Sequence, residues 1–295
     1  MKVLCIDGGG IRGLIPALVL AEIESRTGRR IADMVDLIAG TSTGGILACA
    51  LAKPDPLTAS EVAALYEQEG PEIFSRSLLK RITSVEGFLD ERYSNKGLVD
   101  TLQRHLGDTP MKAATVPLLV PAYDTEARRI RFLRSEGEGS DATMVQAAQA
   151  TSAAPTYFEP VRIGDESLVD GGVFAINPAM CAYAEVAGRL DLLLSLGTGS
   201  HTRPLHYDDI KDWGQLEWAR PLIDVVFDGG QGAVDFQLSA LIDGAYVRLQ
   251  TELREASDDL DDASEDNLAA LRREAERLIA DSDAAIDDVC ARLTA

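Results

Sequence analysis

The chain has 295 residues, of which 46% are hydrophobic, so it can bury a core large enough for one α/β domain. Its 48 acidic and 28 basic residues leave a net charge of -20 at pH 7, which argues against nucleic acid as the main partner and against charge-driven docking on anionic membranes. There is no run of 18 or more apolar residues, no signal-peptide core and no CxxC pair, so we expect a cytoplasmic protein with reduced thiols, no transmembrane segment and no metal site.

The first motif joins a short strand to a helix through a glycine-rich loop. Residues 3–6 predict the strand, residues 7–13 form the loop, and apolar spacing from residue 14 to residue 21 predicts the helix. Such a loop leaves backbone N–H groups free to bind an anion. The spacing of Gly8, Gly10 and Gly13 also fits a dinucleotide-binding loop, but the next strand does not end in the acid that would bind a ribose. An oxyanion hole is therefore favoured, and a nucleotide site or a plain tight turn stays open.

The second motif centres on Ser42. A short buried strand at residues 35–39 leads into Gly40-Thr41-Ser42-Thr43-Gly44-Gly45, and a buried helix follows at residues 46–51. Glycines two before and two after the serine leave room for neighbouring backbone, and the helix N-terminus favours developing negative charge. This pattern predicts a nucleophile elbow, although a serine at a helix start can also be a simple N-cap.

The middle of the chain predicts further alternation of helices and strands. We expect an amphipathic helix at residues 58–70 that ends at Gly70-Pro71, a loop or cap at residues 74–93, and a short helix at residues 98–106. Strands are expected at residues 116–122 and 130–133, and a helix at residues 142–154. This alternation predicts an α/β fold with a mostly parallel sheet and a site at the carboxyl ends of its strands.

The third motif is Asp170-Gly171-Gly172, which follows a short strand at residues 168–169. A carboxylate at a strand end, freed by two glycines, can reach a serine on a nearby strand, and burial can raise its pKa until it accepts a proton. The chain has three histidines, none beside a glycine-framed strand end, so Asp170 is the favoured base and Asp7 the second choice. A triad through His201 or His206 stays open, as does a plain Asp-Gly turn.

Taken together, residues 7–13, 40–45 and 170–172 resemble the signature blocks of the patatin-like phospholipase family, and we interpret the chain as a bacterial member. The similarity continues through residues 150–158, 194–199 and 213–250. It implies a three-layer α/β/α fold and a lipid acyl hydrolase without a cofactor, which cleaves carboxylic esters of phospholipids or lysophospholipids. Residue by residue, it implies Ser42 as nucleophile and Asp170 as proton acceptor. The remaining implied site residues are glycines that form or frame the oxyanion hole, the elbow and the aspartate turn, with one arginine: Gly8, Gly9, Gly10, Arg12, Gly13, Gly40, Gly44, Gly171 and Gly172.

The resemblance leaves several points open. A homo-oligomer, a cyclic-dinucleotide activator and peripheral attachment at a membrane surface all stay compatible with this length. The alternative function is a non-hydrolytic ligand- or nucleotide-binding protein that uses the glycine-rich loop for an anion. We expect residues 1–295 to form a single catalytic domain, in which residues 257–295 are an acidic linker followed by amphipathic helices that pack on it.

Overall fold

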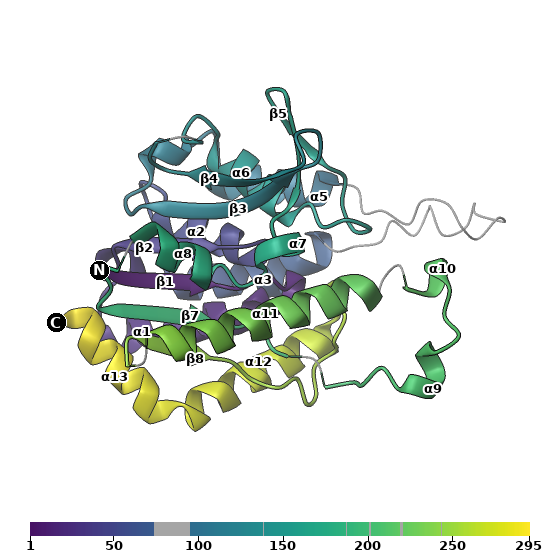
Figure 1. The fold of residues 1–295 in the computed structure, drawn as a ribbon. Coiled ribbons are helices and arrows are strands. Elements are labelled where there is room, and N and C mark those ends of the chain that lie inside the picture. Colours follow the sequence, from purple (N-terminus) through teal and green to yellow (C-terminus); the bar gives the residue numbers. More distant parts are fainter. Residues whose placement is uncertain (74–94, 138, 187, 201, 219–220, 243) are drawn as a thin grey trace.

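The computed structural model describes residues 1–73, 95–137, 139–186, 188–200, 202–218, 221–242 and 244–295 (Figure 1). The loop or cap expected at residues 74–93 therefore lies outside the described residues. Within the described part, an eight-stranded sheet runs through the molecule in the order β5-β6-β3-β2-β1-β7-β8, with β4 also paired to β3. The strands are β1 (Lys2–Ile6), β2 (Leu37–Gly40), β3 (Leu118–Asp124), β4 (Arg129–Arg134), β5 (Val161–Ile163), β6 (Glu166–Asp170), β7 (Leu192–Leu196) and β8 (Tyr246–Leu249).

Strands β1, β2, β3, β7 and β8 pair in parallel, whereas β4, β5 and β6 pair antiparallel with their neighbours. Helices cover both faces, in front of and behind the sheet in Figure 1. They are α1 (Leu14–Thr27), α2 (Thr43–Ala52), α3 (Ala59–Ile73), α5 (Asn95–Leu106), α6 (Met144–Ser152), α7 (Gly172–Ala175), α8 (Ala179–Val186), α9 (Tyr207–Ile210), α10 (Gln215–Trp218), α11 (Pro221–Leu241), α12 (Glu265–Asp281) and α13 (Asp283–Thr294). The α/β prediction with a mostly parallel sheet is thus confirmed.

The side-chain alternation of the strands explains the three layers. Successive residues of a strand point to opposite faces of a sheet. In β1, Leu4 and Ile6 join the core beneath α1, α2, α3 and α12, whereas Val3 and Cys5 join the core beneath α8 and α11. Both faces of the central strands are therefore apolar, as expected for a sheet that is covered on both sides.

One expected helix is longer in the structure, and two strands were not expected. The helix expected to end at Gly70-Pro71 continues as α3 through Pro71 to Ile73. A proline removes one helical hydrogen bond, but α3 packs along α1 and α5, and such tertiary packing outweighs local propensity. Strands β5 and β8 were not expected, because each is short and pairs only at an edge of the sheet.

The position of β6 decides where Asp170 lies. Strand β4 pairs with β3 from Leu119 to Asp124 and so occupies one edge of β3. On the other edge, β2 pairs with β3 at Leu118 and Leu119, and β6 pairs with β3 from Ala122 to Asp124. Strands β2 and β6 therefore lie end to end along the same edge of β3, with their carboxyl ends facing each other. This arrangement brings Asp170, at the end of β6, next to the turn that follows β2.

The C-terminal helices α12 and α13 pack on α1. The acidic segment before them reaches the glycine-rich loop, because the carbonyl of Leu260 accepts a hydrogen bond from the Ile11 N–H at 2.9 Å. The segment that was expected to be a linker thus contacts the predicted site, and the division of the chain into domains stays a prediction. Within the described part, none of the helices has the length and apolar character needed to span a bilayer.

Candidate active site

Ser42 sits in a strained turn between β2 and α2, with φ 54° and ψ -123°. A non-glycine residue with positive φ is uncommon and costs about 1–3 kcal/mol, so the surrounding structure must hold it. A Cβ at Gly40 would lie 2.1 Å from the Gly44 carbonyl oxygen, and one at Gly44 would lie 2.2 Å from the Ile6 carbonyl oxygen. Only glycine fits at these two positions, so β1, β2 and α2 can approach closely enough to make this turn.

Thr151 of α6 fixes the backbone of the turn. Its hydroxyl accepts a hydrogen bond from the Ser42 N–H at 2.9 Å and donates one to the Pro121 carbonyl at 2.6 Å. Pro121 lies in β3 between the part that pairs with β2 and the part that pairs with β6. One buried hydroxyl therefore connects the serine turn to β3, the strand against which β6 and its Asp170 pair.

Asp170 is almost completely buried, with 1% of its surface exposed. Its Oδ1 accepts a hydrogen bond from the Gly172 N–H at 2.7 Å, while its Oδ2 has no hydrogen-bond partner among the described residues. Burial raises the pKa of Asp170 to about 7, and the hydrogen bond from the Gly172 amide partly opposes this increase. The group can therefore gain and lose a proton near neutral pH.

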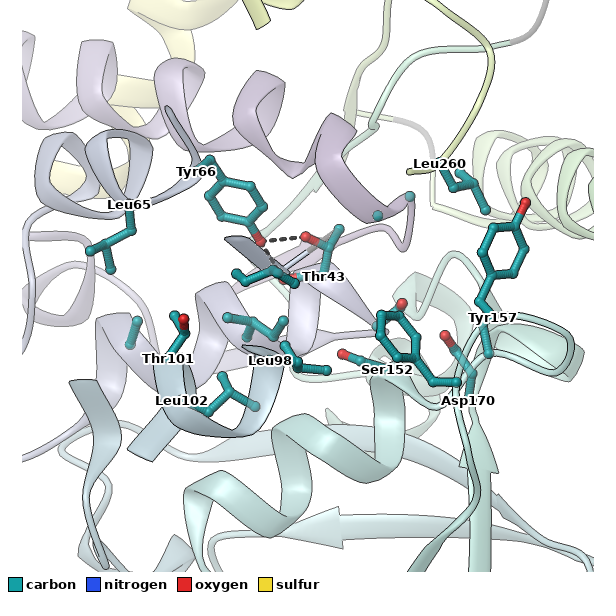
Figure 2. A pocket seen from close by; sticks show the side chains of 18 of the residues that line it. Thr43, Leu65, Tyr66, Leu98, Thr101, Leu102, Ser152, Tyr157, Asp170 and Leu260 are labelled. Atoms are coloured by element: carbon teal, nitrogen blue, oxygen red, sulfur yellow. Dashed lines mark hydrogen bonds between the residues drawn. The ribbon is translucent and has the colours of Figure 1, made fainter. Parts of the chain in front are cut away.

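Ser42, Asp170, Gly9 and Gly10 line one cavity of about 980 Å³, its open mouth included. Figure 2 shows Asp170 with Tyr157 and Leu260 at one end of this cavity and Leu65 with Leu102 at the other. The remaining wall residues come mainly from α2, α3 and α5, with Phe227 from α11, and are mostly apolar: Thr43, Ile46, Ala50, Val62, Tyr66, Ile73, Leu98, Thr101, His105, Leu106, Ser152, Ala154, Phe158 and Phe227. An apolar cavity with a few polar groups at one end is typical of a site that binds a hydrophobic ligand.

The glycine-rich loop lines this cavity with Gly9 and Gly10, whose amides are unpaired among the described residues. The Gly8 N–H donates to the Ile176 carbonyl at 2.9 Å, whereas the amides of Gly9 and Gly10 donate to no described residue. A Cβ at Gly9 would lie 2.3 Å from the Thr198 hydroxyl oxygen. Gly10 has φ 57°, and a Cβ there would lie 2.1 Å from the Leu260 carbonyl oxygen. These close approaches require glycine at both positions.

Three other predicted loop residues surround the cavity without lining it. Arg12 is buried, its Nε donates to the Gly9 carbonyl at 3.4 Å, and burial lowers its pKa. A Cβ at Gly13 would collide with Thr43 and with Tyr66. On the other side of the cavity, a Cβ at Gly171 would lie 2.4 Å from the Pro121 carbonyl oxygen, so the turn after Asp170 is as tightly packed as the loop.

The second-choice base, Asp7, lies elsewhere. Its carboxylate is fully buried and accepts a hydrogen bond from Arg248 Nη2 at 2.5 Å, and it is not among the residues that line the cavity. It therefore supports the start of the loop and is not available as the base. His206 is exposed and also lies outside the cavity wall, and His201 lies outside the described residues. His105 lines the cavity but pairs with Glu69 at 2.8 Å.

Sequence patterns did not indicate several residues of the site. Thr151 and Ser152 end an otherwise unremarkable small-residue helix, and the Ser152 hydroxyl is buried with no hydrogen-bond partner among the described residues. Tyr66 lines the cavity from α3 and forms a hydrogen bond with the Thr43 hydroxyl (Figure 2). These residues come from separate helices, so only the tertiary packing brings them to the site.

Comparison with known proteins defines the family. A family model described as patatin-like phospholipase matches residues 4–183, which is more than half of the chain. The chain belongs to the patatin-like phospholipase family. This confirms the family resemblance found in the sequence, while a bacterial origin stays a prediction.

Relatives of this patatin-like chain cover almost its whole length. It is 32% identical to Patatin-like protein 2 of Arabidopsis thaliana, over 95% of this chain and 83% of that protein. It is 31% identical to Probable inactive patatin-3-Kuras 1 of Solanum tuberosum, over 95% of this chain and 86% of that protein. The fold is similar to that of VipD from Legionella pneumophila, with a TM-score of 0.51 and 12% identity over 95% of this chain and 67% of that one. At this identity the likeness to VipD concerns the fold alone.

Proposed function

We propose that this patatin-like chain is a lipid acyl hydrolase, a serine hydrolase that cleaves carboxylic ester bonds of phospholipids or lysophospholipids. The single observation that carries the proposal is the buried Asp170, whose free Oδ2 and near-neutral pKa accompany Ser42 at one end of an apolar cavity. The cavity suits an acyl chain, because apolar walls remove it from water. Family membership supports the same class of substrate.

In the first step, Asp170 accepts the proton of the Ser42 hydroxyl as the serine oxygen attacks the ester carbonyl. An aspartate with a pKa near 7 is a better base at neutral pH than an exposed one, because proton transfer to it is less unfavourable. The free amides of Gly9 and Gly10 would donate to the oxyanion that forms on the carbonyl oxygen. Asp170 would then return the proton to the leaving alcohol or lysolipid.

In the second step, water attacks the acyl group on Ser42, and Asp170 again acts first as base and then as acid. The product fatty acid leaves and the serine hydroxyl is restored. No histidine takes part in this scheme. Arg12, Gly8 and Gly13 shape the loop without touching the substrate. Gly40 and Gly44 allow the serine turn to pack closely on β1, and Gly171 allows the aspartate turn to pack closely on β3.

The alternative, a non-hydrolytic protein that binds a ligand or nucleotide through the glycine-rich loop, has less support. One relative is named as a probable inactive patatin, so the fold alone does not guarantee activity. However, the amides of Gly8 and Ile11 donate to carbonyl groups of the protein, so they are not free to bind phosphate. The cavity beside the loop is apolar, which suits a lipid better than a nucleotide.

The test is labelling of the full chain with a fluorophosphonate probe, followed by a panel of phospholipids and lysophospholipids. We expect the probe to modify Ser42, and Ser42→Ala to lose both labelling and release of fatty acid while unfolding at the same temperature as the parent. Parent protein that neither labels nor hydrolyses any lipid in the panel would favour the non-hydrolytic alternative. The panel also tests head group and acyl position, and adding a cyclic dinucleotide to it tests whether such an activator is needed.

A further inference from the structure

Exposed hydrophobic side chains are concentrated in one segment. Eight large hydrophobic side chains are exposed among the described residues, and seven of them lie between Leu205 and Leu241. Phe236 is 77% exposed and Tyr207 is 76% exposed. We define the α11 surface as the exposed large hydrophobic residues of α11: Leu222, Val225, Val226, Phe236 and Leu241.

Helix α11 separates this surface from the cavity. It crosses the front of the molecule, with the short helices α9 and α10 just before it in the chain (Figure 1). Its inner side is buried and includes Phe227, which lines the cavity beside Asp170. Its outer side repeats apolar residues at helical spacing from Leu222 to Phe236. One helix thus forms both a wall of the proposed acyl site and an uncovered apolar surface.

The residues around α9 and α10 add aromatic groups of the kind found at lipid–water interfaces. The rings of Trp213 and Trp218 meet edge to face with their centroids 5.3 Å apart, and Tyr207 is exposed at the start of α9. Tryptophan and tyrosine are enriched at such interfaces because each has an apolar body and a polar tip.

Charge restricts the partner. From residue 205 to residue 241 the chain has seven acidic and two basic residues, and α11 itself contains three aspartates and no lysine or arginine. An anionic membrane would repel this segment, and a second copy of a chain with net charge -20 would repel it as well. A zwitterionic lipid surface carries no net charge and accepts apolar side chains at its boundary.

We propose that the α11 surface docks on zwitterionic lipid, with α11 lying along the lipid surface and the cavity behind it. This inference rests on the proposed function, because the docked lipid would be the source of the ester that reaches Ser42. It assigns to α11 the role of holding the cavity at the lipid surface.

The first test measures binding without hydrolysis. Full-length Ser42→Ala protein is floated with vesicles of phosphatidylcholine, and separately with vesicles that also contain phosphatidylserine. We expect it to float with phosphatidylcholine and to float less as the vesicles become anionic. Adding Leu222→Ser and Phe236→Ser should weaken binding by about tenfold or more, since each removes an apolar side chain from the interface. Ile130→Ser is the matched control, because Ile130 is 52% exposed and lies outside the segment, and it should bind as before.

The second test separates docking from chemistry. With Ser42 present, the Leu222→Ser and Phe236→Ser variant should hydrolyse a monomeric short-chain ester as fast as the parent and phosphatidylcholine vesicles at least tenfold more slowly. A parent that binds vesicles but hydrolyses neither substrate would refute the proposed function and leave docking intact. Docking would be overturned if the Ser42→Ala protein failed to float, if the serine variants floated equally well, or if light scattering showed a dimer that these substitutions convert to monomer. The last result would identify a second copy as the partner of the α11 surface.

Discussion

Arg248 Nη2 lies 2.5 Å from Oδ2 of Asp7, and this ion pair connects β8 to the fully buried Asp7 carboxylate at the start of the glycine-rich loop. Arg248→Met should leave the Asp7 carboxylate buried without its partner and reduce the free energy of unfolding by about 3–5 kcal/mol. Adding Asp7→Asn should restore part of that loss, because no buried charge then remains unpaired. Urea unfolding of the parent, the single variant and the double variant measures both effects. Equal stability of the single variant and the parent would mean that the pair contributes nothing.

The pH dependence of hydrolysis should follow Asp170. Its pKa of about 7 means that the carboxylate needed as base is present above neutral pH and is lost as the pH falls through 7. We therefore expect kcat/KM to rise with pH around 7, and Asp170→Asn to reduce it by about 10²-fold to 10⁴-fold. A pH series with a soluble ester tests this expectation. His201→Ala and His206→Ala are the controls, and loss of activity in either one equal to that of Ser42→Ala would require a triad with a histidine base.

The same burial should make Asp170 costly for stability. An aspartate ionises near pH 3.8 in the unfolded chain but near 7 in the fold, so the raised pKa lowers the free energy of unfolding progressively from pH 3.8 to pH 7. At about 1.4 kcal/mol per pKa unit, the total is at most roughly 4 kcal/mol above pH 7. Asp170→Asn should therefore unfold at a higher temperature than the parent at pH 8 and lose this advantage at pH 4. Melting curves of both proteins at pH 8 and pH 4 measure this effect. The same difference in melting temperature between variant and parent at both pH values would contradict the raised pKa.

The two free amides of the loop can be tested through Gly10. Gly10→Ala places a Cβ against the Leu260 carbonyl at a residue with φ 57°, so the loop must move and its donors with it. Turnover should fall by about 10²-fold or more. Gly28→Ala is the matched control, because Gly28 has φ 65° at the end of α1 and nothing lies within 4 Å of its added Cβ. It should lose some stability and keep its activity. A Gly10→Ala variant altered only in KM would assign the loop to substrate binding.

Local patterns were sufficient to predict the three motifs and the strand that precedes each of them. The strand before Ser42, the glycines at Gly40 and Gly44 and the helix after them are encoded within a few consecutive residues, as is the loop at Gly9 and Gly10. Parallel strands then bring such turns to one edge of the sheet. These inferences needed no knowledge of contacts between distant segments.

The remainder of the site depends on contacts that local patterns do not encode. Strand β6 runs antiparallel to β3 within a sheet that is otherwise mostly parallel, and α6 packs against both strands. Leu260 comes from an acid-rich segment whose composition predicts only a solvated linker, yet its carbonyl holds the glycine-rich loop. The exposed apolar side of α11 could not be predicted either, because the spacing of its apolar residues does not show which side of the helix the fold covers.

Strand β3 contributes neither Ser42 nor Asp170, yet it sets the distance between them. Because β2 and β6 share one of its edges, the number of residues from Leu119 to Ala122 determines the gap between their ends. One residue inserted there would move β6 by about 3.3 Å and turn the aspartate toward the opposite face of the sheet. A relative could therefore keep both motifs and still have a β3 of different length. Its serine and aspartate would then be separated, and the motifs alone would not reveal this change.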